Sequence, residues 1–400
     1  MKNIFIGPSV RNGGSLINRL FDHHSQVAAY PMELILPMDS ALHPSLSDRG
    51  QRRNIQNFPN LSAALEFDQM LSLALADVDE SKCMFGRAFD SGLLAAKTTH
   101  ITVKSHFDHR KFIEDLRGSV KPGCGVGEFY NNLHKKFFEY WDEGEHVGSG
   151  EFVAYHSGNG LMADLDIYFS EFDGYFIQPI RSIRGVLASE KKKCLRQLLG
   201  RGLIGRRIKT SDRMLKMLGG RIVENIIVNW LIVLTRATLL KRKYGDRYII
   251  YRHEDLVQNP EPIMRQICGQ LKMQFEGALE IPTIAGEVWG GNSMYGPAKG
   301  LDESLSIIRD VFTNSEERLI EKYTSAAEDF LAGYSGKLIE LSEISDDALF
   351  DHAWQYKIFD SRAETALYLS SMYERWKYQP LFAGLLDRIM HRTKPVYLEL

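Results

Sequence analysis

Residues 11–16 read Arg-Asn-Gly-Gly-Ser-Leu and combine a cation, two adjacent glycines and a hydroxyl. The segment before them, Lys2 to Gly7, is typical of a short buried strand, and the apolar spacing from Ser15 to Phe21 predicts a helix. A glycine loop between a strand and a helix directs backbone N–H groups and the positive end of the helix dipole at an anion. Because Arg11 adds a positive charge to this loop, we expect the anion to be a phosphate or a sulfate.

The loop differs from the Walker A loop of ATPases and kinases. A Walker A loop ends in Gly-Lys-Ser/Thr, whereas this chain has Gly13-Gly14-Ser15 and no lysine there. The difference argues against a small-molecule kinase on the same architecture, which stays an alternative. A kinase would need magnesium ligands and would turn over ATP when magnesium is present.

A second pair of residues could also bind an anion. Arg181 follows an apolar run of strand length, residues 175–180, and Ser189 lies in a predicted helix from about Ile183 to Leu199. A guanidinium at a strand end and a hydroxyl on the next helix can converge on one phosphate, with the arginine making bidentate contacts. The alternative is a surface arginine followed by a helix-capping serine.

Strands alternate with helices along much of the chain. A further apolar run, Tyr248 to Tyr251, resembles a buried strand, and helical patterns cover residues 111–117 and 128–142 and follow Asn259-Pro260. Buried strands alternating with helices predict an α/β fold with a doubly wound parallel sheet flanked by helices.

Four segments resemble the PAPS-dependent sulfotransferases, which use 3′-phosphoadenosine 5′-phosphosulfate (PAPS). Residues 11–16 resemble the Arg-Ser-Gly-Thr-Thr-Leu loop that holds the 5′-phosphosulfate in that family. Arg184 to Glu190 (Arg-Gly-Val-Leu-Ala-Ser-Glu) resembles its 3′-phosphate motif, and Tyr251 to Leu256 resembles its Arg-Tyr-Glu-Asp-Leu signature. Ala298-Lys299-Gly300 resembles the late loop that closes over the nucleotide. The segments occur in the family's order, and the resemblance is to bacterial and carbohydrate-type members.

The resemblance implies a P-loop NTPase-like sulfotransferase domain over residues 1–334, with acceptor-side insertions in residues 38–160. A helical C-terminal extension, residues 335–400, lies beyond it. PAPS is then the sulfuryl donor and adenosine 3′,5′-bisphosphate the product. The cofactor-binding residues implied by the resemblance are Arg11, Asn12, Gly13, Gly14, Ser15, Leu16, Arg181, Ser189, Lys299 and Gly300.

The chain departs from the family pattern at two places. Gly14 stands where the first threonine of the loop is usual, which removes one hydroxyl from the phosphosulfate site. Ser182-Ile183 replaces the usual Asp-Pro, a change that affects the turn more than the phosphate contact. The glycine leaves open a catalytically degenerate member that binds a nucleotide or a partner protein.

Sulfuryl transfer requires in-line positioning, charge stabilisation and a general base. The transferred SO₃ group carries less negative charge than a phosphoryl group, so we expect no metal. Arg11 should stabilise the charge that develops on the bridging oxygen. Glu33 is the first candidate for the base and is expected in a loop between Pro31 and Pro37, and His156 is the alternative.

The expected acceptor is a hydroxyl or amine of a carbohydrate, lipid or small metabolite. A net charge of −2 gives no case for nucleic-acid binding. The chain begins directly at the first predicted strand, which indicates a cytoplasmic protein without a leader or transmembrane segment. The basic stretch from Lys191 to Lys209 predicts a solvated loop with helical flanks, or a surface that attracts anions.

The C-terminal part is expected to be helical from about residue 345 onward. Apolar residues at helical spacing, among them Trp354 and Trp376, must be buried against something. Packing on the main domain is one outcome, and a homodimer interface is the other.

Overall fold

The structure is a computed structural model of the chain, and its described residues form two compact units. The first unit combines Met1–Pro179 with Leu256–Leu305, and the second combines Ile180–Asp255 with Ser306–Leu400. The predicted helices beyond residue 345 lie outside the described residues. The described residues are 1–7, 12–33, 93–97, 102–106, 109–120, 125–141, 150–156, 165–199, 221–284, 286–289 and 311–341. The backbone alone is described for 32–33, 93–97, 102–106, 109–110, 113, 126, 167, 192–199, 221–222, 224–225, 228 and 232.

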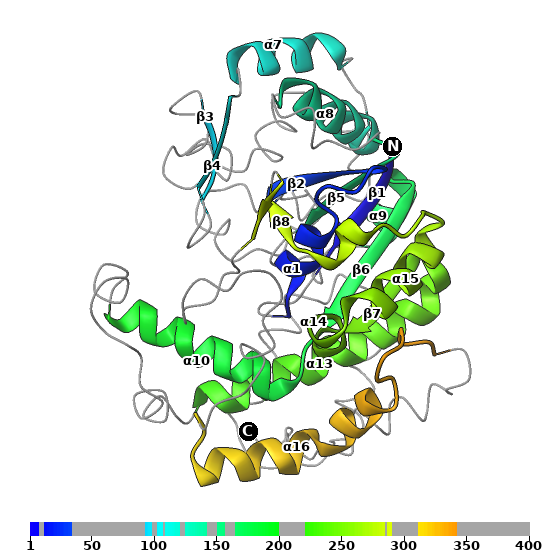
Figure 1. Ribbon diagram of the computed structural model, residues 1–400. Coiled ribbons are helices and arrows are strands. Elements are labelled where there is room, and N and C mark those ends of the chain that lie inside the picture. The colour runs from blue at the N-terminus through cyan, green and yellow to red at the C-terminus, as the bar shows by residue number, and fades with distance from the viewer. Residues whose placement is uncertain are drawn as a thin grey trace, which may run out of the picture. The chain divides into compact units, whose positions relative to one another are not determined.

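Among the described residues, five strands form the main sheet (Figure 1): β1 (Lys2–Ile6), β2 (Val27–Glu33), β5 (Phe152–His156), β6 (Gly174–Ile180) and β7 (Tyr248–Arg252). Their order is β2-β5-β1-β6-β7, so later strands lie on both sides of β1. β1 pairs in parallel with β5 and β6, and β2 pairs in parallel with β5. The predicted doubly wound α/β sheet is confirmed.

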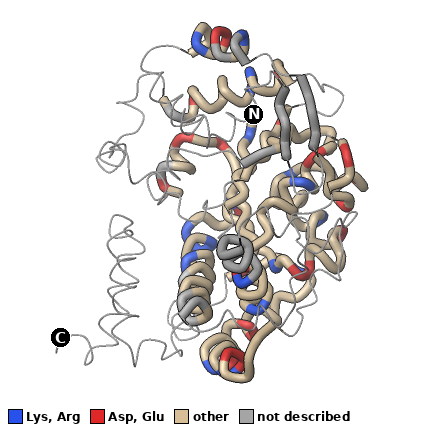
Figure 2. The backbone as a smooth tube through the Cα atoms, turned by 90° about the vertical axis from the view of Figure 1, so that its left-hand side faces the viewer, with Lys and Arg blue, Asp and Glu red and all other residues tan. Residues whose placement is uncertain are grey.

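The strands are buried on both faces. Ile4, Phe5 and Ile6 of β1 are 0% exposed, as expected for a parallel sheet covered by helices. Lys, Arg, Asp and Glu occur in these strands only at a first or last position, so the strand interiors are tan in Figure 2. Lys, Arg, Asp and Glu are therefore confined to the ends of these strands.

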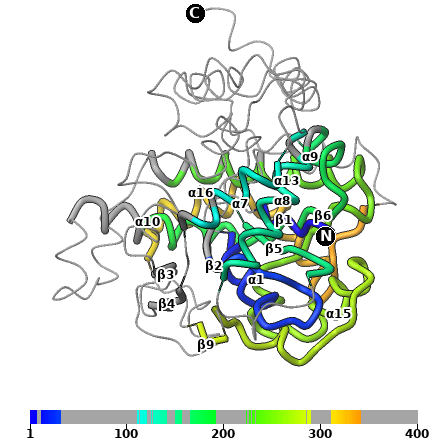
Figure 3. Tube along the Cα trace, turned by 90° about the horizontal axis from the view of Figure 1, so that it is seen from above, coloured from blue at the N-terminus to red at the C-terminus, as the bar shows by residue number. Residues whose placement is uncertain are grey.

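The helices of the first unit include four that the sequence predicts, and two of them, α7 and α8, lie side by side (Figures 1 and 3). The ring centroids of Phe112 in α7 and Phe137 in α8 lie 6.5 Å apart. The first-unit elements outside the main sheet are α1 (Gly14–Leu20), α7 (His109–Ser119), α8 (Val126–Tyr140), α9 (Leu165–Glu171), α15 (Pro260–Leu271), the 3₁₀-helix η4 (Gly277–Glu280) and the hairpins β3 (Leu93–Lys97) with β4 (Thr102–His106) and β8 (Thr283–Ile284) with β9 (Glu287–Val288).

The second unit is built on α10, α13 and α16. The Nζ atom of Lys191 in α10 lies 2.7 Å from a carboxylate oxygen of Glu316 in α16, and both side chains are buried. Lys191 therefore does not belong to a solvated basic stretch, because it satisfies a buried carboxylate. The helices of this unit are α10 (Ile183–Leu199), α13 (Arg221–Tyr244) and α16 (Asn314–Ala332), with the 3₁₀-helix η3 (Gly245–Arg247) before β7 and α14 (His253–Gln258) leading out of it.

The helix α16 begins at a capping box that the sequence analysis did not use. The Thr313 side chain accepts a hydrogen bond from the Glu316 backbone N–H, and the Glu316 side chain accepts one from the Thr313 backbone.

No helix in the described part of the chain is long and apolar enough to cross a membrane.

Candidate functional site

The carboxyl ends of β1, β5 and β2 bring together residues that are far apart in the sequence. Ile6 pairs with His156, and His156 also pairs with Glu33. The glycine loop that follows β1 therefore starts at the same edge of the sheet as both candidate bases. Ligands of open α/β sheets bind at this edge.

The backbone after β1 requires glycine at two positions. A Cβ atom at Gly7 would lie 1.9 Å from the Phe176 ring, and Gly13 has a φ of 92° in the left-handed region. α1 begins directly after Gly13, whose carbonyl accepts a hydrogen bond from Leu16 N at 3.1 Å. Asn12 is buried, and Arg11 lies outside the described residues.

Ser15 and His156 are in direct contact. The Ser15 Oγ atom lies 3.3 Å from His156 Nε2, and His156 is buried at the end of β5. The sequence predicts both residues for the site but not this pairing across 141 positions. Ser15 is thus both a predicted cofactor ligand and a hydrogen-bonding partner of a candidate base.

Glu33 is the last residue of β2, so the expected loop around it is wrong. β2 is at one end of the strand order, so among the described strands it has a neighbour on one side only. Proline is tolerated in such a strand because its missing N–H can face the side without a neighbour. The β2–β5 register also shifts between Ala29 and Glu33, around Pro31. The strand thus continues past the proline, and its pairing with His156 resumes at Glu33.

Two buried residues of α1, missed by the sequence analysis, complete this irregular strand. Asn18 Nδ2 donates to the Tyr30 carbonyl at 2.8 Å, and Arg19 donates to the Tyr30 and Pro31 carbonyls. These carbonyls lie where the register shift interrupts the ladder, so they need other donors. The signal available in the sequence was a polar pair, Asn18-Arg19, inside an otherwise apolar helix.

The Tyr30 side chain continues this support into the core. Its hydroxyl forms a 2.9 Å hydrogen bond with His134 Nδ1, and the His134 ring stacks on Tyr155 at 5.2 Å. Burial lowers the pKa of His134 to about 3, so its imidazole is neutral near pH 7. β2 is therefore held by α1 at its backbone and by α8 at a side chain.

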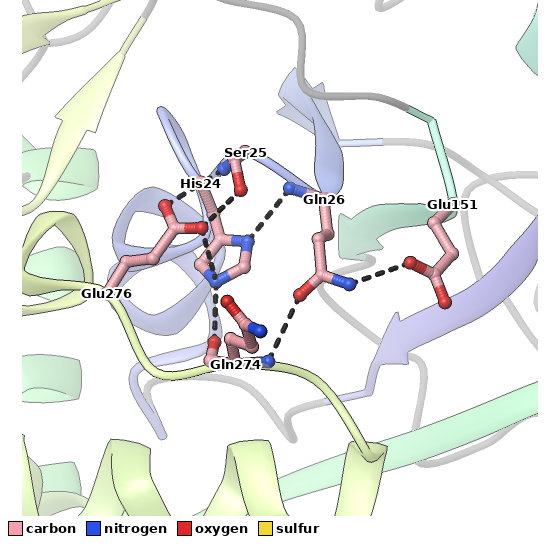
Figure 4. A network of polar contacts seen from close by, with 6 residues as sticks. All are labelled: His24, Ser25, Gln26, Glu151, Gln274 and Glu276. Carbon is pink, nitrogen blue, oxygen red and sulfur yellow. Dashed lines mark hydrogen bonds and ion pairs between the residues drawn. The ribbon is translucent and has the colours of Figure 1, made fainter.

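The chain after α1 is fixed by a polar network (Figure 4). His24 Nδ1 accepts from Gln26 N at 3.1 Å, and its Nε2 contacts the Gln274 carbonyl at 2.9 Å. Since a backbone N–H only donates and a carbonyl only accepts, His24 carries its proton on Nε2. Burial alone would raise the pKa of Glu276, but two hydrogen bonds from Ser25 and the nearby His24 lower it.

The second anion motif lies in the second unit, on the elements that the sequence predicts. Arg181 directly follows β6 and is half-buried, and Ser189 is half-buried on α10. A Cβ atom at Gly185 would lie 2.6 Å from Arg181 Nε. The arginine side chain therefore passes over the first turn of α10, and glycine provides the space.

Two carboxylates accept hydrogen bonds from backbone N–H groups at the start of α10. Ser182 N donates to Glu254 at 3.0 Å, and Ile183 N donates to Glu328 at 2.9 Å. Gly185 N donates to Ser182 Oγ at 3.2 Å, so Ser182 caps the helix. An anion at this motif would consequently depend on the side chains of Arg181 and Ser189.

The environment of Arg181 is also fixed from α13 and α14. Trp230 Nε1 donates to the Arg181 carbonyl at 2.7 Å. Burial, together with the charge of Arg181, lowers the pKa of His253 to about 3. His253 is therefore neutral and adds no charge beside the arginine.

The charged residues of the signature from Tyr251 to Leu256 pair with each other and with the backbone nearby. Arg252 and Asp255 lie 3.7 Å apart, and Asp255 accepts a hydrogen bond from Gly336 N at 3.0 Å. Lys299 and Gly300 lie outside the described residues. In the described part of the chain, no three His, Cys, Asp or Glu side chains are grouped as metal ligands would be.

Comparison with known proteins gives matches among solved structures. No protein-family model and no curated protein sequence matches the chain. The sulfotransferase domain of the Synechococcus PCC 7002 olefin synthase is 16% identical, with 80% of this chain and 95% of that chain covered and a TM-score of 0.39. The sulfotransferase domain of the curacin biosynthetic pathway is 18% identical, with 80% and 97% covered and a TM-score of 0.41.

Sulfotransferase STF1 from Mycobacterium tuberculosis H37Rv is 15% identical, with 78% of this chain and 76% of that chain covered and a TM-score of 0.32. Scores of this size do not establish a shared fold.

Proposed function

We propose that the chain is a PAPS-dependent sulfotransferase that transfers a sulfuryl group to a hydroxyl or amine of a carbohydrate, lipid or small-metabolite acceptor. The observation that carries this proposal is that each anion motif directly follows a strand of the parallel sheet. The glycine loop follows β1 and Arg181 follows β6, and these strands are parallel neighbours in the sheet. The motif sequences support a phosphosulfate at the first position and a 3′-phosphate at the second.

The first motif supplies donors suited to a phosphosulfate. Asn12 to Leu16 would hold it through backbone N–H groups and the Ser15 hydroxyl, around the left-handed turn at Gly13. Arg11 would act on the charge that develops on the bridging oxygen as the bond to sulfur breaks. The leaving group is adenosine 3′,5′-bisphosphate, and its 3′-phosphate is assigned to Arg181, Ser189, Lys299 and Gly300.

The acceptor must lose a proton as its oxygen or nitrogen bonds to sulfur. Glu33 is the proposed base, and His156 is the alternative. Both lie at the carboxyl end of their strands and are paired in register, which supports a base at this edge. His156 already contacts the Ser15 hydroxyl of the glycine loop, which favours Glu33 as the base.

Two measurements test the proposal. Calorimetry should show that the intact protein binds adenosine 3′,5′-bisphosphate more tightly than adenosine 5′-phosphate. Radiolabelled PAPS with a library of hydroxyl and amine acceptors should then give a labelled product. Binding without transfer to any acceptor would indicate the degenerate alternative, which the missing hydroxyl at Gly14 favours. Magnesium-dependent ATP turnover without nucleotide-bisphosphate binding would indicate a kinase and overturn the proposal.

A further inference from the structure

The backbone turn from Arg181 to Ile183 is fixed by a residue far away in the sequence. Glu328, in α16, accepts the hydrogen bond of Ile183 N at 2.9 Å across 145 positions. Ile183 is 0% exposed, so its N–H needs an acceptor within the protein. Glu328 is this acceptor, and it thereby fixes the backbone two residues after Arg181, at Ile183.

The choice of a carboxylate at this position is costly. Glu328 is half-buried, and burial raises the pKa of its carboxyl above the ordinary value. The negative charge of Glu254 raises it further, whereas the Ile183 hydrogen bond and the charges of Arg184 and Arg252 lower it. A carboxylate that is buried at such a cost is expected where it positions a functional residue. A long arginine side chain loses much entropy when it is held in one conformation, so its backbone must be well fixed.

We propose that Glu328 is a positioning residue for the Arg181 anion site, fixing through Ile183 the turn from which the arginine extends. The role of Arg181 in binding a 3′-phosphate rests on the proposed function. The positioning of the turn does not, because it follows from the hydrogen bonds that Glu328, Glu254 and Trp230 make with its backbone.

Two properties of Glu328 act in opposite directions on an anion. Its hydrogen bond holds the turn, which favours binding, whereas its negative charge disfavours an anion beside Arg181. Glu328→Gln separates them, since a glutamine keeps the acceptor oxygen and removes the charge. Glu328→Ala removes both, and Glu328→Asp keeps the charge but shortens the reach.

Glu317 provides a matched control on the same helix. Its carboxylate lies 2.7 Å from Arg184 Nη2, and both side chains are partly exposed. Glu317→Gln therefore removes one charge from α16 without removing a hydrogen bond to the 182–183 backbone.

The first test needs no ligand. Trp230 Nε1–H donates to the Arg181 carbonyl, so its indole cross-peak in a ¹H–¹⁵N spectrum reports the turn. Glu328→Ala and Glu328→Asp should shift this cross-peak, whereas Glu328→Gln and Glu317→Gln should leave it in place. An unshifted cross-peak in both the alanine and aspartate variants would overturn the positioning role. If the alanine variant does not fold, the aspartate variant decides.

The second test measures binding of two nucleotides by calorimetry. Glu328→Ala should weaken adenosine 3′,5′-bisphosphate about tenfold, the value of one hydrogen bond that orders a charged side chain, and adenosine 5′-phosphate less than about twofold. Glu328→Gln should bind the bisphosphate at least as tightly as the wild type. Equal losses for both nucleotides, or a glutamine variant as weak as alanine, would overturn the proposal. A wild-type protein that binds neither nucleotide would overturn the proposed function, while the Trp230 cross-peak still tests the turn.

Discussion

In the first unit, buried donors of α1 reach backbone carbonyls of β2, whereas in the second unit carboxylates reach backbone N–H groups at the start of α10. Arg19 and Asn18 provide the donors, and Glu254 and Glu328 provide the acceptors. Both arrangements satisfy polar groups that the main sheet and helix leave without partners. The signs of the charges that they introduce are opposite.

This difference bears on how each motif would hold an anion. Arg19 adds a positive charge to the helix that follows the glycine loop, so its support and its field both favour an anion. Glu254 and Glu328 add negative charges beside the turn of Arg181, so their support and their field oppose each other. The second motif should therefore depend more strongly on the exact placement of one arginine, and the first on several groups acting together.

Arg11→Ala should have the largest effect on turnover. It removes a charge that acts mainly on the transition state, so kcat should fall by about 10² to 10³, equivalent to about 3–4 kcal/mol. Steady-state kinetics with saturating PAPS measures this loss. Arg265→Ala is the control, since Arg265 is 57% exposed on α15. A raised KM with kcat unchanged would make Arg11 a binding residue.

Glu33→Gln separates the two candidate bases at the sheet edge. Turnover should fall by about 10², because the glutamine keeps the shape but accepts no proton, while adenosine 3′,5′-bisphosphate affinity holds. His156→Gln should cost less. If the histidine change is the more damaging one, His156 is the base.

Ser15→Ala sharpens this result. Since Ser15 and His156 share a 3.3 Å contact, their substitutions should be non-additive in kcat. Additive losses would show that the two side chains act separately.

Arg181→Ala tests the dependence of the second motif on one side chain. Binding of adenosine 3′,5′-bisphosphate should weaken by about 2–3 kcal/mol, the value of a charge-assisted bidentate contact. Adenosine 5′-phosphate, which lacks the 3′ group, should lose little. Ser189→Ala should show the same selectivity with a smaller loss. Calorimetric titration with each nucleotide measures both, and an equal loss for the two nucleotides contradicts the 3′-phosphate assignment.

The sequence predicts the parts of the fold that are carried by local apolar patterns. β1, β6 and β7 are predominantly apolar, and α10 follows its strand at the predicted position. β2 lacks such a signal because Pro31 interrupts it and its pairing shifts there. α16 lacks an apolar start, although the Thr313–Glu316 capping box marks its beginning.

The support of each motif could not be predicted in this way. Residue type and spacing place Ser15 and Arg181, but their surroundings come from distant parts of the chain, as with His156 and Glu328. Lys191 shows the same effect, because a run of basic residues predicts solvent and the structure pairs this lysine with buried Glu316. A contact between residues over a hundred positions apart leaves no periodic signal in one sequence.

The acid stability of the chain should reflect two buried histidines whose pKa is lowered, His134 in the first unit and His253 in the second. The folded-state pKa values of His134 and His253 are lowered to about 3, whereas an unfolded histidine titrates at about 6.5. The unfolded chain thus binds more protons between these values, so stability should fall as the pH is lowered through this range. Each histidine should add up to about one proton to the uptake on unfolding.

Urea unfolding at a series of pH values measures this slope. His253→Leu should flatten it, since it removes one of the two histidines that take up a proton on unfolding. His134→Leu should flatten it as well but lower stability at pH 7, because Tyr30 loses its partner. A slope that neither change alters would show that the carboxylates dominate acid unfolding.

Gly185→Ala should have the smallest effect, and it tests the placement of Arg181 without removing any charge. A Cβ atom would lie 2.6 Å from Arg181 Nε and 3.1 Å from Ser182 Oγ, so the arginine must move. We expect adenosine 3′,5′-bisphosphate binding to weaken by about fivefold to tenfold, within the range of one hydrogen bond. The free energy of unfolding should hold or rise by up to about 1 kcal/mol, since alanine is the better helix former.

Gly269→Ala in α15 is the control, because its Cβ would meet nothing within 4 Å, so it should gain stability and keep its affinity. Affinity that is unchanged in Gly185→Ala would mean that the second motif tolerates a displaced arginine, and the contrast between the two motifs would then lie in their charges alone.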